Sequence, residues 1–452
     1  MKNMNVQNHP LQGEKKVMQK LKVSTLAASI TLLIAQSAST YASDIEIYTK
    51  PSSTASSGVV VMMLDTSGSM DVSNAGTSAC DLPEGLSSSR TISSSDLTEN
   101  GYKKRYCYFG SGADLPIYYY YKQNQKWYSC LKGTTNNSSS CFSELTTIPS
   151  ITGFVKSISG SKEFYSKTAS RNTTKYYDRI SRLKDALYTL AIMPVYDETT
   201  KVGIKADVKI GIGTFPYVGD GENNRRGYIR IPAAAWGAVG SSQRTKVLNL
   251  IKSSSFIGNG GTPTSAAYAE AAAYLLGTTT GGGEYSGINL SKAADSSLVS
   301  GSNYVTPLDK SAGAAECSGQ GIYFLTDGQP QTLETSNTSS LMKNALRMSV
   351  NYTFSTGLSG GSNDGVNLGN GWYPVWVKSD WRAIGSFAKS LNDPEIIKNA
   401  LNVSEAKREV LTAVVGFGSV FDGTYSSMNQ DAKNAYDWGL AEEEAGVYGK
   451  GS

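Results

Sequence analysis

The sequence predicts an α/β protein with a doubly wound, mostly parallel sheet of the Rossmann-like kind. Its strongest indication is a set of uninterrupted apolar runs of strand length, such as "VVVMML" at 59–64, which are typical of strands buried on both faces. Segments with helical apolar spacing alternate with these runs; in 177–193, for example, Ile180, Leu183, Leu187 and Leu190 recur at that spacing. Strands that alternate with helices favour a parallel sheet covered on both faces.

The elements follow from the same patterns in chain order. Predicted strands lie at 59–64, 208–216, 227–233, 321–328 and 409–418, with a further short one at 44–48. Predicted helices lie at 177–193, 242–253, 260–277, 339–348, 381–391, 394–401 and 431–443, and the third opens on a glycine turn with Pro263 at its first helical position. Residues 278–316 are predicted as a Gly/Ser-rich loop, and residues 71–175 as an inserted subdomain of short strands.

The N-terminus predicts export. Lys15, Lys16, Lys20 and Lys22 lie just before a short apolar core at 23–38, and small residues suited to cleavage end at about Ala42. Met18 is a candidate start, because the segment from there alone forms an ordinary signal; an uncleaved anchor is the alternative. The expected organisation is a signal peptide at 1–42, a linker at 43–57, an α/β domain at 58–445 interrupted by the 71–175 insertion, and a tail at 446–452.

Charge and histidine content exclude several functions. The whole sequence has a net charge of +4, and residues 1–42, with five lysines and one glutamate, account for all of it. The exported part is therefore near neutral and gives no indication of a nucleic-acid partner. No P-loop or complete dinucleotide fingerprint is present, so no nucleotide is expected. The single histidine, His9, lies in the signal region, which excludes a Ser-His-Asp triad, a Cys-His pair and a zinc HExxH site from the exported chain.

The cysteines indicate disulfides. Four of the five fall in the insertion and lack the CxxC spacing of a zinc site: Cys80, Cys107, Cys130 and Cys141. An exported chain favours two disulfides among them, with three connectivities open. Cys317 is either a buried thiol or the partner of one of the four.

Polar residues follow the predicted strands at three places. They are Asp65, Ser67 and Ser69 in a loop at 65–69 (the DTSGS loop), Thr262 in a loop at 260–264 (the GGTPT loop), and Asp327 after the 321–326 run. In a doubly wound sheet these residues converge at the carboxyl ends of the strands, where ligands bind. Carboxylates and hydroxyls without imidazole or thiolate favour Mg²⁺, Mn²⁺ or Ca²⁺, and hydroxyl ligation leaves the ion able to attract a carboxylate from a partner. Taken separately, Asp65 could cap a helix and Asp327 could end a strand at a turn.

The set resembles the metal-ion-dependent adhesion site of von Willebrand factor A domains. The resemblance covers roughly 58–70 and 176–440, and the 71–175 insertion is not a standard part of that domain. It implies that Ser67, Ser69 and Thr262 bind the metal directly, and that the two aspartates, Asp65 and Asp327, act directly or through water. The implied function is divalent-metal-dependent adhesion.

A narrower resemblance is to the N-terminal half of the PilY/PilC type IV pilus tip-associated adhesins and biogenesis factors. It is carried by "ASDIEIYTKPS", the strand and DTSGS loop, the cysteine-rich insert, "CSGQGIYFLTDGQP" and "DAKNAYDWGLAEE". It implies a place at the cell surface on a pilus tip, with outer-membrane association left open, and partners that are pilus subunits or host surface proteins bound through an acidic residue. That family usually continues into a C-terminal β-propeller, whereas this sequence stops at Ser452, as either a fragment or a truncated gene product. The resemblance therefore does not extend to roles that depend on the propeller, such as control of pilus retraction. Membrane association is expected only through the pilus or an absent C-terminal region.

Two other functions remain as alternatives to adhesion. One is a structural or force-sensing role in pilus biogenesis, with the metal as support. The other is a metal-dependent hydrolase, which we do not expect, since such sites need a base and the exported chain has no histidine.

Overall fold

The computed structural model describes residues 58–82, 92–109, 117–130, 141–145, 149, 151–152, 154–159, 162–168, 175–217, 219, 225–310, 319–327, 330, 335–349, 351–352, 354, 380–404, 408–418, 421 and 425–440. The expected signal peptide, linker, strand at 44–48 and C-terminal tail, as well as Cys317, lie outside these residues. Among the described residues, none of the helices has the length and apolar character needed to cross a membrane.

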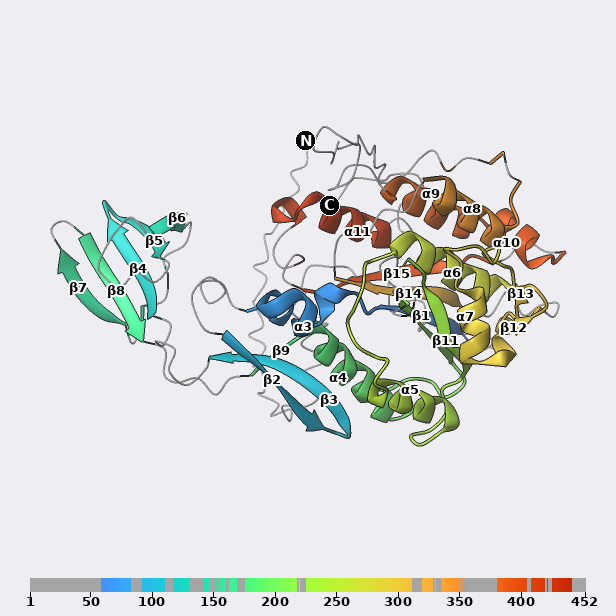
Figure 1. The fold of residues 1–452 in the computed structure, drawn as a ribbon, viewed down its shortest axis with the longest axis horizontal. Helices are drawn as coiled ribbons and strands as arrows, with labels where there is room; N and C mark the ends of the chain where they lie inside the picture. Colours follow the sequence, from blue (N-terminus) through green and yellow to red (C-terminus); the bar gives the residue numbers. More distant parts are fainter. Residues whose placement is uncertain are drawn as a thin grey trace, which may run out of the picture. The chain divides into compact units, whose positions relative to one another are not determined.

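A five-stranded, mostly parallel sheet forms the centre of the α/β fold (Figure 1). Its strand order is β11-β10-β1-β14-β15, and only β11 runs antiparallel to its neighbour. The bounds are β1 Val59–Asp65, β10 Lys209–Phe215, β11 Tyr228–Ala235, β14 Gln320–Thr326 and β15 Leu411–Gly416. The first strand of this sheet in the sequence is therefore the central one, as in one of the common orders of doubly wound sheets.

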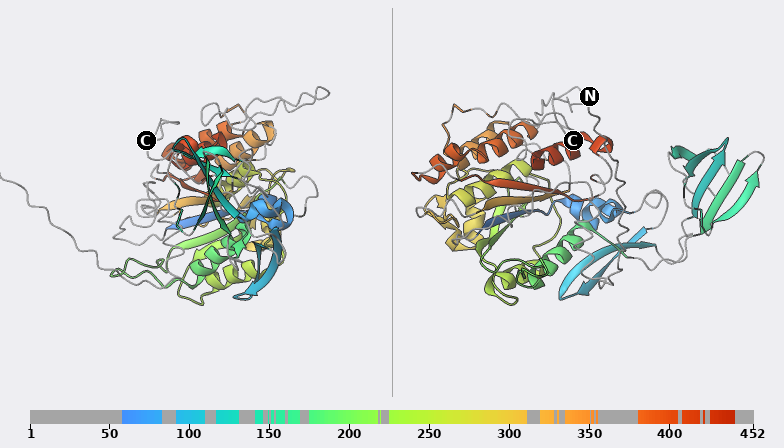
Figure 2. Two further views of the ribbon diagram at one scale, coloured as in Figure 1. Left: turned by 90° about the vertical axis from the view of Figure 1, so that its left-hand side faces the viewer. Right: turned by 180° about the vertical axis from the view of Figure 1, so that it is seen from behind.

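Helices cover both faces of this sheet, as the side view and the back view in Figure 2 show. Alternate residues of β1 point to opposite faces: Val61 and Met63 belong to one buried cluster, and Leu64 belongs to the other. One face is covered by α4 Arg179–Ile192 and α5 Ser242–Lys252. The other is covered by α6 Thr264–Leu276, α7 Ile288–Ala294, α8 Thr335–Leu346, α9 Trp381–Leu391, α10 Pro394–Leu401 and α11 Gln430–Leu440.

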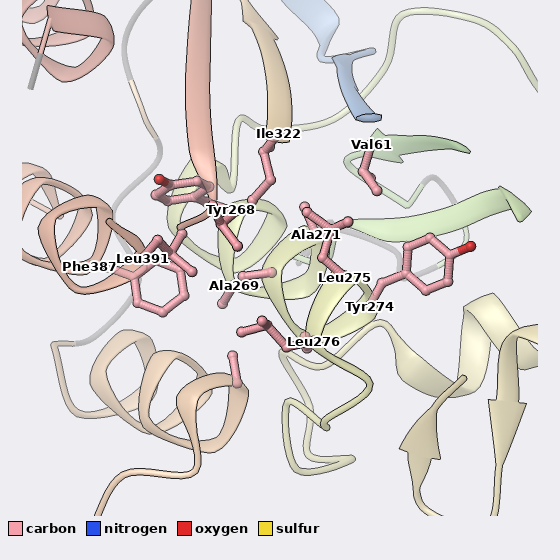
Figure 3. Close-up of a cluster of buried hydrophobic side chains, with 14 of the residues drawn as sticks. Val61, Tyr268, Ala269, Ala271, Tyr274, Leu275, Leu276, Ile322, Phe387 and Leu391 are labelled. Carbon is pink, nitrogen blue, oxygen red and sulfur yellow. The ribbon is translucent and has the colours of Figure 1, made fainter. Parts of the chain in front are cut away.

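The helix α6 is buried along its whole length (Figure 3). Its alanines let the helix lie close to the strands, where Ala271 and Leu275 pack in one cluster with Val61 and Ile322. Tyr268 makes edge contacts with neighbouring aromatic rings and shares a hydrogen bond with Thr412 at 2.6 Å. Such close packing holds the start of α6, and with it the GGTPT loop, against the sheet.

The strands and helices predicted for the α/β domain are confirmed, with ends that shift by a few residues. Two details were wrong. Pro263 is the N-cap of α6 instead of its first residue. The predicted loop at 278–316 contains α7 and a small β-ribbon, β12 Val299–Ser300 with β13 Asn303–Tyr304.

The insertion contains short strands, as predicted, arranged in two antiparallel sheets. One has the order β2-β3-β9, with β2 Ile92–Glu99 and β3 Tyr102–Phe109 in the insertion and β9 Tyr176–Tyr177 directly after it. The other has the order β6-β5-β4-β8-β7, with β4 Ile117–Gln123, β5 Lys126–Cys130, β6 Cys141–Leu145, β7 Val155–Ser159 and β8 Lys162–Thr168. Two short 3-10 helices, η2 Gly68–Met70 and η3 Gly76–Cys80, flank the short helix α3 Val72–Ala75.

One disulfide is formed among the described side chains, and it joins Cys80 to Cys107. It ties the end of η3 to β3, and both cysteines are buried. Cys130 and Cys141 are cross-strand partners in the backbone register of β5 and β6.

Candidate metal centre

The site lies where β1 and β14 end side by side at the centre of the sheet. Asp65 is the last residue of β1, and Asp327 follows directly after β14. Both carboxylates are withdrawn from solvent, with Asp65 fully buried and Asp327 6% exposed. Parallel strands in register bring their carboxyl ends to one edge, so residues far apart in sequence meet here.

The two aspartates are linked through the backbone and a hydroxyl. Asp65 Oδ2 accepts a hydrogen bond from the backbone N–H of Asp327 at 3.2 Å and from Thr326 Oγ1 at 3.1 Å. Its other oxygen, Oδ1, accepts from the N–H of Ser67 at 2.8 Å. Asp65 is thus held in one orientation by the loop that follows it and by the neighbouring strand.

The two serines of the DTSGS loop lie together. The Oγ atoms of Ser67 and Ser69 are 2.9 Å apart and share a hydrogen bond. Ser67 is buried and Ser69 is half-buried, so the pair leads from the buried aspartates toward the surface. Neighbouring ligands of an octahedral Mg²⁺ with bonds of 2.0–2.1 Å are separated by about 2.9 Å, and the two hydroxyls already have that spacing.

The GGTPT loop is held against the DTSGS loop by backbone contacts. The N–H of Gly68 donates to the carbonyl of Gly260 at 2.8 Å, and the N–H of Asn259 donates to the carbonyl of Thr66 at 2.8 Å. Gly260 has a φ of +83°, which favours glycine at this turn. Thr262 is half-buried two residues further on, and within the described residues no hydrogen bond joins its hydroxyl to the other four predicted ligands.

Of the five predicted ligands, four are therefore connected. Asp65, Ser67, Ser69 and Asp327 form one polar cluster, whereas Thr262 is brought near by its loop alone.

Sequence reasoning missed Arg179, the first residue of α4. Its Nη1 donates to Asp327 Oδ2 at 3.0 Å and to the carbonyl of Ser69 at 3.2 Å, and its Nη2 pairs with Asp81 at 2.5 Å. A signal was present in the sequence, because a cation in the first turn of a helix opposes the helix dipole and needs a separate explanation.

Burial and mutual repulsion shape the electrostatics of the cluster. Burial, followed by the negative charge of Asp327, raises the pKa of Asp65 to about 7. Burial also raises the pKa of Asp327, against the opposing effects of Ser69 and Arg179. For Asp81, burial is outweighed by the hydrogen bond and charge of Arg179 together with Arg182, so its pKa is lowered. Two buried carboxylates with raised pKa values indicate that the cluster is short of positive charge.

The donor set fits a hard divalent cation. It offers two carboxylates and paired hydroxyls at octahedral spacing, and no nitrogen or sulfur ligand. Among the described residues, no three His, Cys, Asp or Glu side chains are grouped so that they could hold a metal ion together. A metal ion bound here would therefore need hydroxyl ligands beside the two aspartates.

Comparisons with known proteins add no relative. No protein-family model matches the chain, and no curated protein or solved structure matches it either.

Proposed function

We propose that this chain is an exported, non-enzymatic binding protein with a von Willebrand factor A-like domain that holds a divalent metal ion and uses it to capture a carboxylate. The observation that carries the proposal is the convergence of Asp65, Ser67, Ser69 and Asp327 at the end of the central strand. The strand order, with the first strand in the middle, supports the same domain type.

The roles of the residues are those that the resemblance to von Willebrand factor A domains implies. Ser67, Ser69 and Thr262 would supply neutral hydroxyl ligands, while Asp65 and Asp327 would supply charge directly or through water. Mg²⁺ or Mn²⁺, or alternatively Ca²⁺, would act as a Lewis acid toward an outside oxygen ligand. Because Ser69 and Thr262 are only half-buried, the solvent side of the cluster is where a partner's carboxylate would arrive.

We further propose a place at the tip of a type IV pilus, with adhesion and pilus assembly as the processes served. Its support is the order of sequence motifs and the disulfide within the insertion. The partner would be a pilus subunit or a host surface protein that presents an acidic side chain.

A structural role for the metal is the second candidate. Its support is that Asp65 also joins the ends of β1 and β14 through Thr326 and Asp327, so that an ion here would brace the sheet. In that case metal removal would lower the thermal midpoint and leave capture of acidic ligands unaffected.

Calorimetric titration of Mg²⁺, Mn²⁺ and Ca²⁺ into the purified chain tests the proposal. We expect about one ion per chain, with binding lost in Asp65→Ala and weakened in Thr262→Ala, while circular dichroism stays native. Repeating the titration with acetate present tests carboxylate capture, because acetate should tighten metal binding. Equal metal affinity in the native chain and Asp65→Ala would contradict the proposal.

A further inference from the structure

Arg179 is a buried cation built into the edge of the candidate centre. Its side chain is 9% exposed and forms ion pairs with Asp327 and Asp81, whose side chains are 4% and 9% exposed. The same guanidinium donates to the carbonyl of Ser69 at 3.2 Å. It therefore touches a predicted metal ligand on each of two loops.

The position of Arg179 is fixed from several sides. Asp178 caps α4 by accepting from the N–H of Ser181 at 3.0 Å, and it also accepts from the N–H of Val72 at 3.2 Å. Gly418, after β15, lies so close that a Cβ there would be 2.7 Å from Arg179 Nε. A cation held in this way is part of the site and not a surface side chain that happens to reach it.

Arg179 also supplies the charge that the cluster needs. In the ion pairs of the described residues, it is the only cation that meets either Asp65 or Asp327. Arg182 lies three residues further along the same helix, has a side chain that is 36% exposed, and pairs with Asp81. Asp65, Asp81 and Asp327 together with the guanidiniums of Arg179 and Arg182 carry one net negative charge, whereas the same groups without Arg179 would carry two.

We propose that Arg179 is the resident counter-cation of the centre and sets its selectivity for an anionic ligand. The inference rests on the proposed metal-binding function. A guanidinium on Asp327 Oδ2 competes with the metal for the same carboxylate and lowers metal affinity. Once a divalent ion is bound, the same guanidinium leaves the centre with one net positive charge, where a centre without it would be neutral. The loaded site then favours an acidic partner over a neutral one.

The test compares three variants of the full chain. Arg179→Gln removes the charge, and Arg179→Lys keeps it. Arg182→Gln is the matched control, because it removes a neighbouring charge that, among the described residues, pairs with Asp81 and with neither Asp65 nor Asp327. Mn²⁺ affinity is measured by calorimetry with and without acetate, and the thermal midpoint is measured in chelator.

For Arg179→Gln we expect Mn²⁺ to bind on the order of tenfold more tightly, since an opposite charge at this distance changes a carboxylate's cation affinity by at least that factor. We also expect acetate to increase the Mn²⁺ affinity of Arg179→Gln by a smaller factor than that of the native chain. The thermal midpoint of this variant in chelator should be lower than the native one. Arg179→Lys should keep Mn²⁺ affinity within about twofold of native, and Arg182→Gln should leave both the affinity and the acetate effect unchanged.

Weaker or unchanged Mn²⁺ binding in Arg179→Gln would overturn the proposal, as would an identical gain in Arg182→Gln. If Arg179→Gln does not fold, Arg179→Lys decides, because a large change in its Mn²⁺ affinity contradicts a role based on charge. Absence of Mn²⁺ binding in the native chain would refute the proposed function. In that case the thermal midpoint of unfolding in chelator tests the counter-charge role. Equal midpoints for Arg179→Gln and Arg182→Gln would contradict that role.

Discussion

The backbone N–H of Gly68 donates to the carbonyl of Gly260 at 2.8 Å, which joins the DTSGS loop to the GGTPT loop. Neither residue contributes a side chain, so the contact depends on how closely the two backbones approach. Two further hydrogen bonds accompany this contact. The N–H of Asn259 donates to the carbonyl of Thr66, and Asn74 Nδ2 donates to the carbonyl of Gly258 at 2.6 Å. The geometry of the candidate centre is thus set by backbone packing as much as by its ligands.

Adding one methyl group at Gly258 should displace the DTSGS loop. A Cβ there would lie 2.7 Å from Asp71 Cβ and 2.9 Å from the carbonyl oxygen of Ser67, both too close for the present packing. For Gly258→Ala we expect a loss of about 1–3 kcal/mol in the free energy of unfolding and weaker metal binding. Calorimetry and urea unfolding measure the two effects.

Gly283→Ala is the matched control for that substitution. A Cβ at Gly283 meets nothing within 4 Å, and its φ lies outside the positive range. We expect it to behave like the native chain. If both variants bind metal normally, the two loops are less tightly coupled than the contacts indicate.

The raised pKa of Asp65, at about 7, predicts the pH dependence of the metal-free protein. Its unfolded value is about 4, so between roughly pH 4 and pH 7 the folded chain binds more protons than the unfolded chain. The free energy of unfolding contributed by this group therefore falls as pH rises through that window, by an amount on the order of 1 kcal/mol or more. Asp65→Asn should make the free energy of unfolding decrease less as the pH rises.

Urea unfolding in chelator at pH 5 and pH 7.5 measures this slope. Glu270, whose pKa burial also raises to about 7, contributes a decline of the same sign, so part of the slope should survive in Asp65→Asn and should become smaller when Glu270→Gln is added. The raised pKa of Asp327 accounts for a remaining slope of the same sign. An unchanged slope in both variants would show that neither carboxyl titrates as described.

The main elements of the sheet could be predicted because their signals are local. Apolar runs define β1, β10 and β14, and helical spacing together with an Asp-Pro start at 393–394 defines α10. The DTSGS loop and Asp327 could likewise be placed at one edge, because parallel strands bring their carboxyl ends together.

The rest depends on contacts between distant residues. The ribbon of β12 and β13 and the helix α7 lie in a Gly/Ser-rich stretch with weak local preference, and they are held by the buried side chain of Glu270. Arg179 and Asp327 lie 148 residues apart in the sequence, so no local spacing predicts the pair. Propensity and periodicity carry no information on such pairs.

Glu270 is expected to be important for stability away from the candidate centre. It is fully buried in α6 and accepts hydrogen bonds from Thr280 Oγ1 at 2.8 Å, from the N–H of Gly287 at 2.9 Å, and from the hydroxyl of Tyr304. Glu270→Ala leaves these donors buried without an acceptor, so we expect a loss of roughly 3 kcal/mol in the free energy of unfolding. Glu270→Gln, which keeps one carbonyl oxygen, should lose less.

The control for Glu270 is Glu284→Ala, because Glu284 is an exposed glutamate in the loop before α7. Urea unfolding should show it within about 0.5 kcal/mol of native. Equal losses in the free energy of unfolding for Glu270→Ala and Glu284→Ala would contradict the idea that the hydrogen bonds to Glu270 hold α7 in place.

A second disulfide is expected between Cys130 and Cys141. The two residues are partners in the antiparallel register of β5 and β6, next to a register shift after Ser129. Directly opposed residues in such a pair have Cα atoms about 4.5–5.5 Å apart, which lies within the range that a disulfide spans. Cys80 and Cys107 are already joined, so of the three connectivities that the sequence allows, only the one with Cys130–Cys141 remains for two bonds among these four.

Peptide mapping of the unreduced protein by mass spectrometry checks this pairing. We expect a linked Cys130–Cys141 peptide, and a loss of about 2–3 kcal/mol in the free energy of unfolding when both cysteines are replaced by serine. Alkylating the native protein before digestion provides the counter-test. Alkylated Cys130 or Cys141, or a peptide that links either one to Cys317, would contradict the pairing and leave the edge of this sheet without a covalent link.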